Sequence, residues 1–423
     1  MNYSDLGRRS CCLIDGVHWF MKWKFIVLLF FIGVIQCVSP TKIYGDVRTG
    51  TMGFSQGDSV QFSLLTCAPG QEIYALFGHT AIRYQNFSQG TDLVFNYGMF
   101  SFNAPNFIYR FVKGETDYQL GITPFPYFEA EYALRGSSVY QQVLNLTPSE
   151  KQTLWKLLRD NYLPENRTYR YNYFYDNCTT RARDQIEKSI RGKVVYPSVE
   201  WVKTFRGIVH EFTVGSPWDE LGIDLCLGAE ADEAIDIRKQ MFAPFYMRYF
   251  ADGAYIRDAD GNTRPFILRE EKIVDVTPEP EPAFGLTPME AGALFLLLNV
   301  LVGFWQWKKK CIFWGWDVLL YAAQGIAGCI IAFLFFVSSH PTVGSNWLLL
   351  LFNPIPLFYL PFMVYRDIKH KKDWYHLVNL VYLTLFMLLF LLLPQEFNLT
   401  VLPLALGLLV NAASHVLVLN KKE

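Results

Sequence analysis

Apolar residues are distributed unevenly along the chain, which divides near residue 277. Before that point apolar and polar residues are mixed, whereas most of the residues after it are apolar. The second part contains five apolar segments, each of about 20 residues or more, which is the length that a helix needs to span a bilayer. They are approximately 288–307, 313–337, 346–365, 375–394 and 397–419. The pattern predicts an all-α domain, residues 288–423, of five transmembrane helices.

Basic residues predict how these spans are oriented. Lysine or arginine residues follow the first, third and fifth segments, whereas the loops after the second and fourth segments contain neither. Because basic loops stay in the cytoplasm, we expect the residues before the first span to lie on the outer face of the membrane. The proline-rich stretch 278–287 is predicted to be a stiff linker between the two parts. Asn353 and Pro354 interrupt the third segment, which predicts a packed kink.

The N-terminal residues have the pattern of an export signal. Two lysines precede an apolar run of about eleven residues, and polar residues follow it. We predict that residues 1–39 are a signal peptide or, if they are not removed, an N-terminal anchor, with Met21 as a candidate start. A lipoprotein signal that ends at Cys37 is a weaker alternative, because Gln36 stands where such signals have a small residue. The exported domain is then residues 40–277.

The exported domain mixes strand and helix patterns. Runs rich in β-branched and aromatic residues are bounded by turn residues, and the turn at 86–92 joins two of them into a hairpin. Thr147 and Glu150 form a capping box, which marks a helix start. Ile186 and Ile190 lie four residues apart, as in a helix with one apolar stripe. Strands are predicted at 61–65, 73–84 and 93–100, and helices at 148–162, 179–191 and 197–210. These elements indicate the α+β class.

Candidate chemistry centres on Cys178, which lies between an aromatic, strand-like run and the predicted helix 179–191. Asp176 and Asn177 suit the N-cap region of that helix. A cysteine at a helix start is close to unpaired N–H groups and to the positive end of the helix dipole, and both favour the thiolate. The alternative is that Cys178 is only a small buried apolar residue.

The best partner for such a thiolate is His79, about a hundred residues earlier. If the hairpin turn centres near Ser88, His79 lies opposite Gly98, and Asn96 lies diagonally on the same face. An amide there would hold the imidazole in one tautomer, as the third member of a nucleophile, base and orienting group does. Asn96 as a plain turn or sheet-end residue, with Tyr97 or Asp92 as the orienting group, stays open. His79 as a satisfied strand histidine also stays open.

Composition narrows the functional classes. The net charge of −1 gives no reason to expect a nucleic-acid partner. The exported domain contains three cysteines, so Cys67 and Cys226 could pair and leave Cys178 as a free thiol. The sequence contains no CxxC motif and no clustered His/Cys set, so we expect neither a metal site nor a cofactor. The aromatic stretch 102–127 is either core or an acyl-chain groove. The remaining candidate substrate-binding residues are Arg83, Tyr97, Asp176, Asn177, Arg181 and His340.

Long segments resemble the Lnb-type bacterial lipoprotein N-acyltransferases. They are LLTCAPGQEIYALFGHTAIR, DLVFNYGMFSF, RFVKGETDYQLG, LPENRTYRYNYFYDNCTTRARD and the five-span tail, so the similarity runs from about Ser63 to the C-terminus. In papain and in unpermuted NlpC/P60 enzymes the cysteine precedes the histidine. The order here, with His79 before Cys178, resembles the circularly permuted NlpC/P60 group, which includes the lecithin:retinol acyltransferase-like enzymes.

The resemblance implies an exported cysteine acyltransferase domain on a membrane domain in the bacterial inner membrane. By that resemblance Cys178 corresponds to the nucleophile and His79 to the base, whereas Asn96 rests on the hairpin argument alone. A phospholipid or a diacylglyceryl lipoprotein would be the acyl donor, and the N-terminal amine of a lipoprotein the acceptor. We expect N–H groups at the start of the helix to stabilise the oxyanion. A membrane-bound cysteine hydrolase and a non-catalytic membrane scaffold are the two rival hypotheses.

Overall fold

The computed structural model describes residues 59–70, 72–100, 105–276, 285–369, 371 and 373–420. For residues 419 and 420 it describes only the backbone. The predicted signal or anchor at residues 1–39 lies outside the described residues, and so do residues 278–284 of the predicted linker. The described part of the predicted exported domain therefore begins at residue 59 and ends at residue 276.

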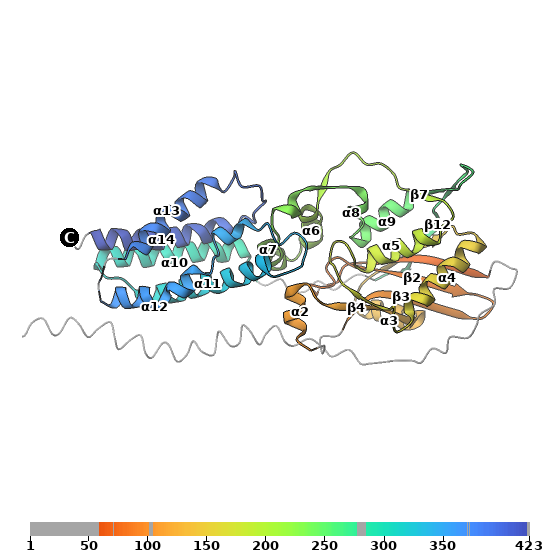
Figure 1. Cartoon of the computed structure of the whole chain (residues 1–423), viewed down its shortest axis with the longest axis horizontal. Coiled ribbons are helices and arrows are strands. Elements are labelled where there is room, and N and C mark those ends of the chain that lie inside the picture. The colour runs from red at the N-terminus through yellow and green to blue at the C-terminus, as the bar shows by residue number, and fades with distance from the viewer. Residues whose placement is uncertain are drawn as a thin grey trace, which may run out of the picture. The chain divides into compact units, whose positions relative to one another are not determined.

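A seven-stranded antiparallel sheet forms the centre of this domain (Figure 1). The strands lie in the order β12-β5-β1-β2-β3-β4-β6, so β1, β2 and β3 are neighbours both in sequence and in space. The strands are β1 (Val60–Cys67), β2 (His79–Asn86), β3 (Thr91–Met99), β4 (Asp117–Pro124), β5 (Val139–Leu144), β6 (Thr168–Arg170) and β12 (Ile267–Val274). The β2–β3 hairpin pairs Ala81 with Asn96, in agreement with the register predicted from the sequence.

Helices cover both faces of the sheet because residues on each strand alternate between the two faces. Leu65, Ala81 and Val94 pack against helix α3, whereas Phe62 and Tyr84 face the opposite side, where Tyr84 stacks on Trp155 of α4. Helices α4, α5 and α9 contact the strands on this second side. The helices are α2 (Phe107–Lys113), α3 (Phe125–Leu134), α4 (Pro148–Tyr162), α5 (Cys178–Ser189) and α9 (Pro244–Asp252). The predicted capping box at Thr147 begins α4.

A second apolar core, beside the sheet, holds the two segments that carry His79 and Cys178. Phe77, which precedes β2, and Phe174, which precedes α5, both pack in this core. The ring centres of Phe174 and Phe205 lie 4.1 Å apart. The surrounding elements are β8 (Lys203–Thr204), α6 (Phe205–Thr213), α7 (Pro217–Cys226), η1 (Ala229–Asp232), β9 (Ala234–Ile235) and α8 (Ile237–Gln240). A small sheet lies in the order β11-β10-β7, with β7 (Lys193–Val195), β10 (Tyr255–Arg257) and β11 (Thr263–Pro265).

Three sequence expectations for this domain are wrong. Residues 73–77 form a turn, so the predicted strand 73–84 begins only at His79. The predicted helix 197–210 begins at Phe205, because the Thr204 hydroxyl caps it by accepting a hydrogen bond from the Gly207 N–H at 2.9 Å. Cys67 and Cys226 do not pair, and both are free thiols. Cys67 is buried in the sheet, whereas Cys226 ends helix α7.

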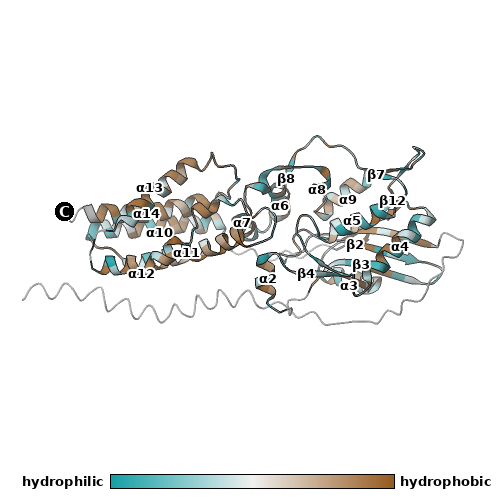
Figure 2. Ribbon diagram, in the orientation of Figure 1, coloured by the Kyte–Doolittle hydropathy of each residue, from teal (hydrophilic) through white to brown (hydrophobic). Residues whose placement is uncertain are grey.

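Four helices of the described C-terminal part are long and apolar enough to cross a membrane. They are α10 (Pro288–Lys309), α11 (Trp314–Phe336), the Trp347–Ile368 segment and α14 (Val401–Asn420, apolar over Val401–Val418). Figure 2 shows the mainly hydrophobic residues of these helices. The predicted kink divides the third segment into η2 (Trp347–Leu350) and α12 (Ile355–Ile368). A Cβ on Gly328 would lie 2.2 Å from the carbonyl carbon of Asn353, so α11 needs this glycine to approach the kink.

The fourth predicted span is shorter than expected. It forms α13 (Trp374–Leu389), which has 16 residues. At a rise of 1.5 Å per residue this helix is about 24 Å long, less than the roughly 30 Å of a hydrocarbon core. The sequence prediction of membrane-spanning helices is therefore confirmed for four segments, and the prediction of a fifth span is not.

Buried polar groups join the predicted exported domain to the loops of the predicted membrane domain that precede α14 and α12. Arg206 is 0% exposed and donates to Asp224 at 2.7 Å and to Asp232 at 2.6 Å. Asp224 also accepts from Asn398, in the loop before α14, at 3.1 Å. His210 lies 2.9 Å from Asp224, and this hydrogen bond, opposed by partial burial, raises the His210 pKa. His210 is thus satisfied by a carboxylate at this junction.

Candidate active site

His79 is the first residue of β2, and the residue before it fixes its place. Gly78 has φ +77°, a left-handed conformation that side chains disfavour. A Cβ on Gly78 would lie 2.3 Å from the carbonyl oxygen of Cys67, on the neighbouring strand. Cys67 pairs with His79 in the sheet. The glycine therefore allows the chain to approach β1 closely, and this approach positions the His79 imidazole at the end of the sheet.

Asn96 contacts the imidazole, as the hairpin argument expects. Its Oδ1 lies 3.2 Å from His79 Nε2. The two residues share one face of the β2–β3 hairpin, because Asn96 pairs with Ala81 and side chains alternate along a strand. The ring of Tyr132, on α3, lies parallel to the imidazole at 6.5 Å. These contacts leave Nδ1 of His79 for Cys178.

Cys178 is the first residue of α5, and Asn177 is the N-cap. The Asn177 Oδ1 accepts hydrogen bonds from the N–H groups of Thr179 and Thr180, both at 2.9 Å, and its Nδ2 donates to the Phe242 carbonyl. Asn177 is buried and fully engaged, so it fixes the start of the helix. N–H groups at the start of this helix were expected to stabilise an oxyanion. Those of Thr179 and Thr180 already donate to Asn177.

The two side chains shift each other's protonation. Burial raises the pKa of Cys178, but the charge of His79 and its hydrogen bond to the thiolate outweigh burial, so the Cys178 pKa is lowered. The Thr80 N–H also donates to the sulfur. Burial lowers the pKa of His79, but the Cys178 charge and the hydrogen bonds to Cys178 and Asn96 leave it raised. Both directions favour a thiolate beside an imidazolium.

A bulge in the sheet makes room for this pair. The β3–β4 register shifts between Asn96 and Met99, and Gly98 within the bulge has φ +88°. A Cβ on Gly98 would lie 3.6 Å from the Cβ of Cys178. Gly98, at the position that the sequence predicts opposite His79, therefore lies close to the cysteine side chain.

Four tyrosines lie near enough to Cys178 to feel its charge, and none of them is among the residues predicted for the site. Burial raises the pKa of each one, and the negative charge at Cys178 raises it further, so their hydroxyls stay protonated. The hydroxyl of Tyr173 is buried and has no hydrogen-bond partner among the described residues. The alternation of tyrosines at 169, 171 and 173 is a sequence signal that could have revealed three of them, whereas the fourth comes from β4. They are Tyr118, Tyr169, Tyr171 and Tyr173.

Comparison with protein families gives two matches that together cover most of the chain. The model of the Lnb N-terminal periplasmic domain matches residues 52–209, and that of the Lnb transmembrane domain matches residues 279–423. The chain belongs to the Lnb family. No curated protein and no solved structure matches it. This Lnb-family protein is thus a multi-pass membrane protein with a periplasmic domain.

Three of the predicted substrate-binding residues of this Lnb-family protein are engaged in internal contacts. Arg83 is buried, pairs with Asp92 at 2.6 Å and lies over the ring of Phe125. It is four residues beyond His79, about 13 Å along the strand. The Tyr97 hydroxyl is bonded to Asn161 at 2.7 Å. The Asn177 amide caps α5.

The other three predicted substrate-binding residues lie nearer to open surface. Asp176 and Arg181 are half-buried and form a two-pronged ion pair at 2.6 and 2.8 Å. The guanidinium of Arg181 lies 3.6 Å from the ring centre of Tyr169, one of the four tyrosines beside Cys178. His340, in the loop after α11, donates from Nε2 to the carbonyl of Phe111 in α2 at 2.6 Å. His340 therefore connects the membrane domain to the periplasmic domain.

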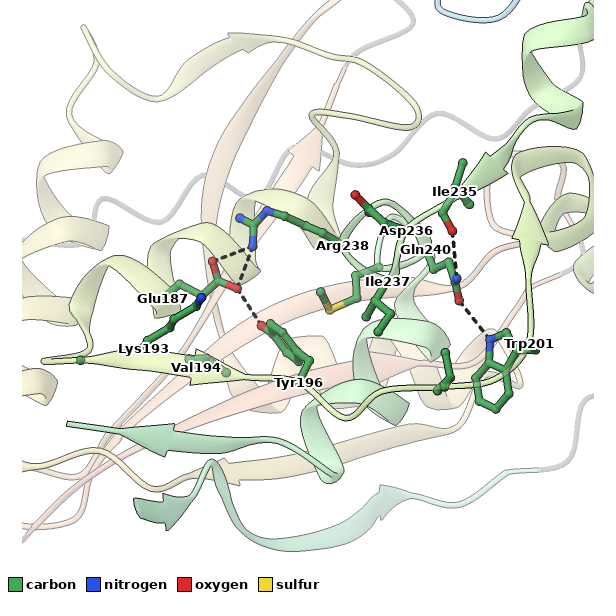
Figure 3. A pocket seen from close by; sticks show the side chains of 13 residues that line it. Glu187, Lys193, Val194, Tyr196, Trp201, Ile235, Asp236, Ile237, Arg238 and Gln240 are labelled. Atoms are coloured by element: carbon green, nitrogen blue, oxygen red, sulfur yellow. Dashed lines mark hydrogen bonds and ion pairs between the residues drawn. The ribbon is translucent and has the colours of Figure 1, made fainter. Parts of the chain in front are cut away.

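A cavity of about 670 Å³ lies away from Cys178, between the C-terminal end of α5 and α8 (Figure 3). Its polar side chains are paired with each other. Glu187 accepts from Arg238 at 3.0 Å and from the Tyr196 hydroxyl at 2.8 Å, and Trp201 donates to Gln240 at 3.2 Å (Figure 3). Most of the polar side chains that face this cavity thus serve internal contacts, and we assign it no role.

Proposed function

We propose that this Lnb-family protein is a lipoprotein N-acyltransferase of the bacterial inner membrane. Cys178 is the nucleophile, His79 the base and Asn96 the residue that orients His79. The observation that carries the proposal is this Cys-His-Asn set, with a lowered Cys178 pKa, in a periplasmic domain joined to membrane spans. The same three residue types recur in papain-like enzymes. We further propose that the domain is of the permuted NlpC/P60 type and that α13 completes a fifth span.

The first half-reaction transfers an acyl chain to the enzyme. The Cys178 thiolate attacks the carbonyl carbon of a glycerolipid ester, so an S–C bond forms and the C–O bond of the ester breaks. The imidazolium of His79 gives its proton to the departing glycerol oxygen. The products are a thioester on Cys178 and a lipid with one free hydroxyl. The donor is a phospholipid or the diacylglyceryl group of the lipoprotein itself.

The second half-reaction releases the acyl chain onto an amine. The N-terminal amine of the lipidated cysteine of a lipoprotein attacks the thioester, an N–C bond forms, and the S–C bond breaks. His79, now neutral, accepts the proton that the amine loses, which restores the thiolate–imidazolium pair. No nucleic acid and no cofactor enters either step.

We assign the oxyanion of both steps to Tyr173. The N–H groups of Thr179 and Thr180 already donate to Asn177, so they are not free for this role. The Tyr173 hydroxyl is buried, its pKa is raised by burial and then by the charge at Cys178, and no described residue accepts its proton. A protonated donor held beside the sulfur stabilises negative charge as it develops on the attacked oxygen.

A row of aromatic rings is a further argument that the substrate is a lipid. Neighbouring rings in this aromatic row lie between 4.1 and 6.0 Å apart. The row begins beside Cys178 and ends in α2, where the carbonyls of residues 111–113 accept hydrogen bonds from the loop after α11. An acyl chain that leaves the outer leaflet could follow the row to the thiolate while water is kept away. The row consists of Tyr171, Tyr118, Phe100, Phe107 and Phe111.

The experiment that tests the proposal uses the purified full chain in vesicles. The vesicles contain phospholipids with deuterated acyl chains and a synthetic diacylglyceryl lipopeptide with a free amine, and products are identified by mass spectrometry. We expect the wild type to produce N-acylated lipopeptide and Cys178→Ala to produce none. A deuterated N-acyl chain identifies the phospholipid as donor, and an unlabelled one with loss of an O-acyl chain identifies the lipopeptide.

Two outcomes would contradict the proposal. Equal N-acylation by Cys178→Ala would remove Cys178 from the mechanism. Release of free fatty acid at the same rate with and without lipopeptide would instead indicate a hydrolase, which the same three residues could serve.

A further inference from the structure

A cluster of ionisable side chains lies inside the membrane domain, at the end of the bundle that carries the basic loops. It includes His376 at the start of α13, His415 near the end of α14 and Asp367 near the end of α12. The two histidines are 0% exposed and Asp367 is 6% exposed. Ionisable groups inside membrane spans are costly and are usually functional.

Each of these side chains has one buried polar atom without a partner. The atoms are Nε2 of His376, Nδ1 of His415 and Oδ2 of Asp367, and none has a hydrogen-bond partner within the part of the chain that the structure describes. A donor atom of each of the three residues lies within 4.8 Å of the others. Three neighbouring residues that each keep an orphaned buried atom indicate a missing common partner, because buried polar groups are almost always satisfied.

The opposite ring nitrogens are held by a second layer of side chains. His415 Nε2 lies 3.0 Å from Asp317 Oδ2, and His376 Nδ1 lies 3.4 Å from the hydroxyl of Tyr321. Asn411 donates to Asp317 at 2.8 Å and accepts from Tyr321 at 3.1 Å, which closes the network. A histidine that binds a metal through one nitrogen commonly has the other nitrogen fixed by a carboxylate or a similar group.

We propose that His376, His415 and Asp367 bind a divalent first-row transition-metal ion, with zinc as the probe. Two imidazole nitrogens and a carboxylate oxygen suit zinc and its neighbours rather than calcium or magnesium, which prefer oxygen ligands. Asp367 and Asp317 supply negative charge for a divalent cation in a site away from water. The sequence gives no sign of this site, since its ligands come from three helices and form no motif.

Binding requires one imidazole to turn. The rings of His376 and His415 are stacked at 3.7 Å with 9° between their planes, and two parallel rings cannot both direct a lone pair at one ion. His376 is the ring that turns, because its bond to Tyr321 is long at 3.4 Å, whereas the bond from Asp317 to His415 is 3.0 Å. An ion bound there would tie α12, α13 and α14 together and would hold the short helix α13 in the bundle.

The test is the metal content of the full chain, which is independent of acyl transfer. The protein is purified in detergent with an affinity tag that contains no histidine, incubated with zinc, freed of excess metal by gel filtration and analysed by mass spectrometry of the elements. We expect about one zinc ion per wild-type chain and a loss of at least tenfold in His376→Gln and in Asp367→Asn, which is nearly isosteric. Zinc should also raise the melting temperature of the wild type but not of these variants.

A matched control is His210→Gln. His210 lies with Glu220 and Asp224 in a second group of potential ligands, but its carboxylate contact and the Glu220 bond to the Thr213 hydroxyl at 2.9 Å satisfy that group internally. We expect this variant to keep the wild-type zinc content. A folded wild type that takes up no zinc would overturn the proposal, and so would zinc content that is unchanged in both ligand variants or lost only in His210→Gln.

Discussion

His79 Nε2 lies 3.2 Å from Asn96 Oδ1, across the β2–β3 hairpin. Since an amide oxygen only accepts, this contact places the proton of a neutral imidazole on Nε2. Nδ1 is then left with its lone pair beside the Cys178 thiol, where it can take the thiol proton. One hydrogen bond thus decides which nitrogen of His79 acts on the proposed nucleophile.

Asn96→Ala should therefore slow acyl transfer without unfolding the domain. A hydrogen bond to a charged group is worth about 1.5–3 kcal/mol, so we expect a decrease in kcat of about ten- to a hundredfold. The measurement is the initial rate of N-acylation of the lipopeptide, with the melting temperature as a check on folding. A rate equal to that of the wild type would show that Asn96 does not position His79.

The lowered Cys178 pKa predicts how its reaction with iodoacetamide depends on pH. The wild type should react quickly near neutral pH, because the Cys178 pKa lies below the ordinary thiol value and more of the side chain is therefore in the reactive thiolate form. In His79→Gln the imidazolium is gone while burial remains, so the Cys178 pKa should rise and fast alkylation should require alkaline pH. The pH–rate profile of both proteins is measured by peptide mass spectrometry.

Two other thiols serve as internal controls for that profile. Burial raises the pKa of Cys226 to about 11, and it raises the pKa of Cys67 as well, so neither should react near neutral pH. Slow alkylation of wild-type Cys178, with the same profile as Cys226, would contradict the ion pair and favour the scaffold hypothesis.

Tyr173→Phe separates oxyanion stabilisation from thiolate activation. Removal of one oxyanion donor typically lowers kcat by about a hundred- to a thousandfold, and we expect a decrease of that order. Alkylation of Cys178 involves no oxyanion, so its rate near neutral pH should stay within about twofold of the wild-type rate. An unchanged acylation rate would exclude Tyr173 from the role. A loss of both reactions would indicate instead that the variant disturbs Cys178 itself.

Gly78→Ala and Gly90→Ala form a matched pair, because Gly78 directly precedes β2 and Gly90 lies in the turn that follows it. Both glycines have positive φ, which costs an alanine about 1–2 kcal/mol. Only Gly78 is also crowded, because its new Cβ would lie 2.3 Å from the Cys67 oxygen, whereas nothing lies within 4 Å at Gly90. We expect Gly90→Ala to remain active with a modestly lower melting temperature, and Gly78→Ala to lose both stability and acylation. Equal effects would show that the approach to β1 is unimportant.

The local parts of this site could be predicted from the sequence. A short turn between β2 and β3 fixes the hairpin register, so the diagonal relation of His79 and Asn96 follows from counting residues. The position of Cys178 at a helix start likewise follows from the polar residues Asp176 and Asn177 and the apolar spacing after them. Both inferences need only contacts between residues that are near in sequence.

Contacts between distant segments were beyond such reasoning. Residues 73–77 look like a strand, but Leu76 and Phe77 pack into the core beside α6, so the segment turns instead. The odd number of cysteines suggested a disulfide, yet Cys67 and Cys226 belong to different layers of the domain. The unpartnered Tyr173 hydroxyl and the His376–His415 stack arise only when helices and strands from different parts of the chain pack together.

The last prediction concerns the route of the lipid. Ile108 is 74% exposed on α2, beside the end of the aromatic row, and α2 is hydrogen-bonded to the loop after α11. Ile108→Asp places a charge where we expect acyl chains to enter, so N-acylation in vesicles should decrease about tenfold while Cys178 alkylation stays unchanged. Leu134→Asp is the matched control, because Leu134 is 90% exposed at the end of α3, which contributes no ring to the row, and the acylation rate of this variant should equal that of the wild type. Equal losses in the two variants would indicate a general effect of surface charge, and no loss in either would mean that lipid reaches Cys178 by another route.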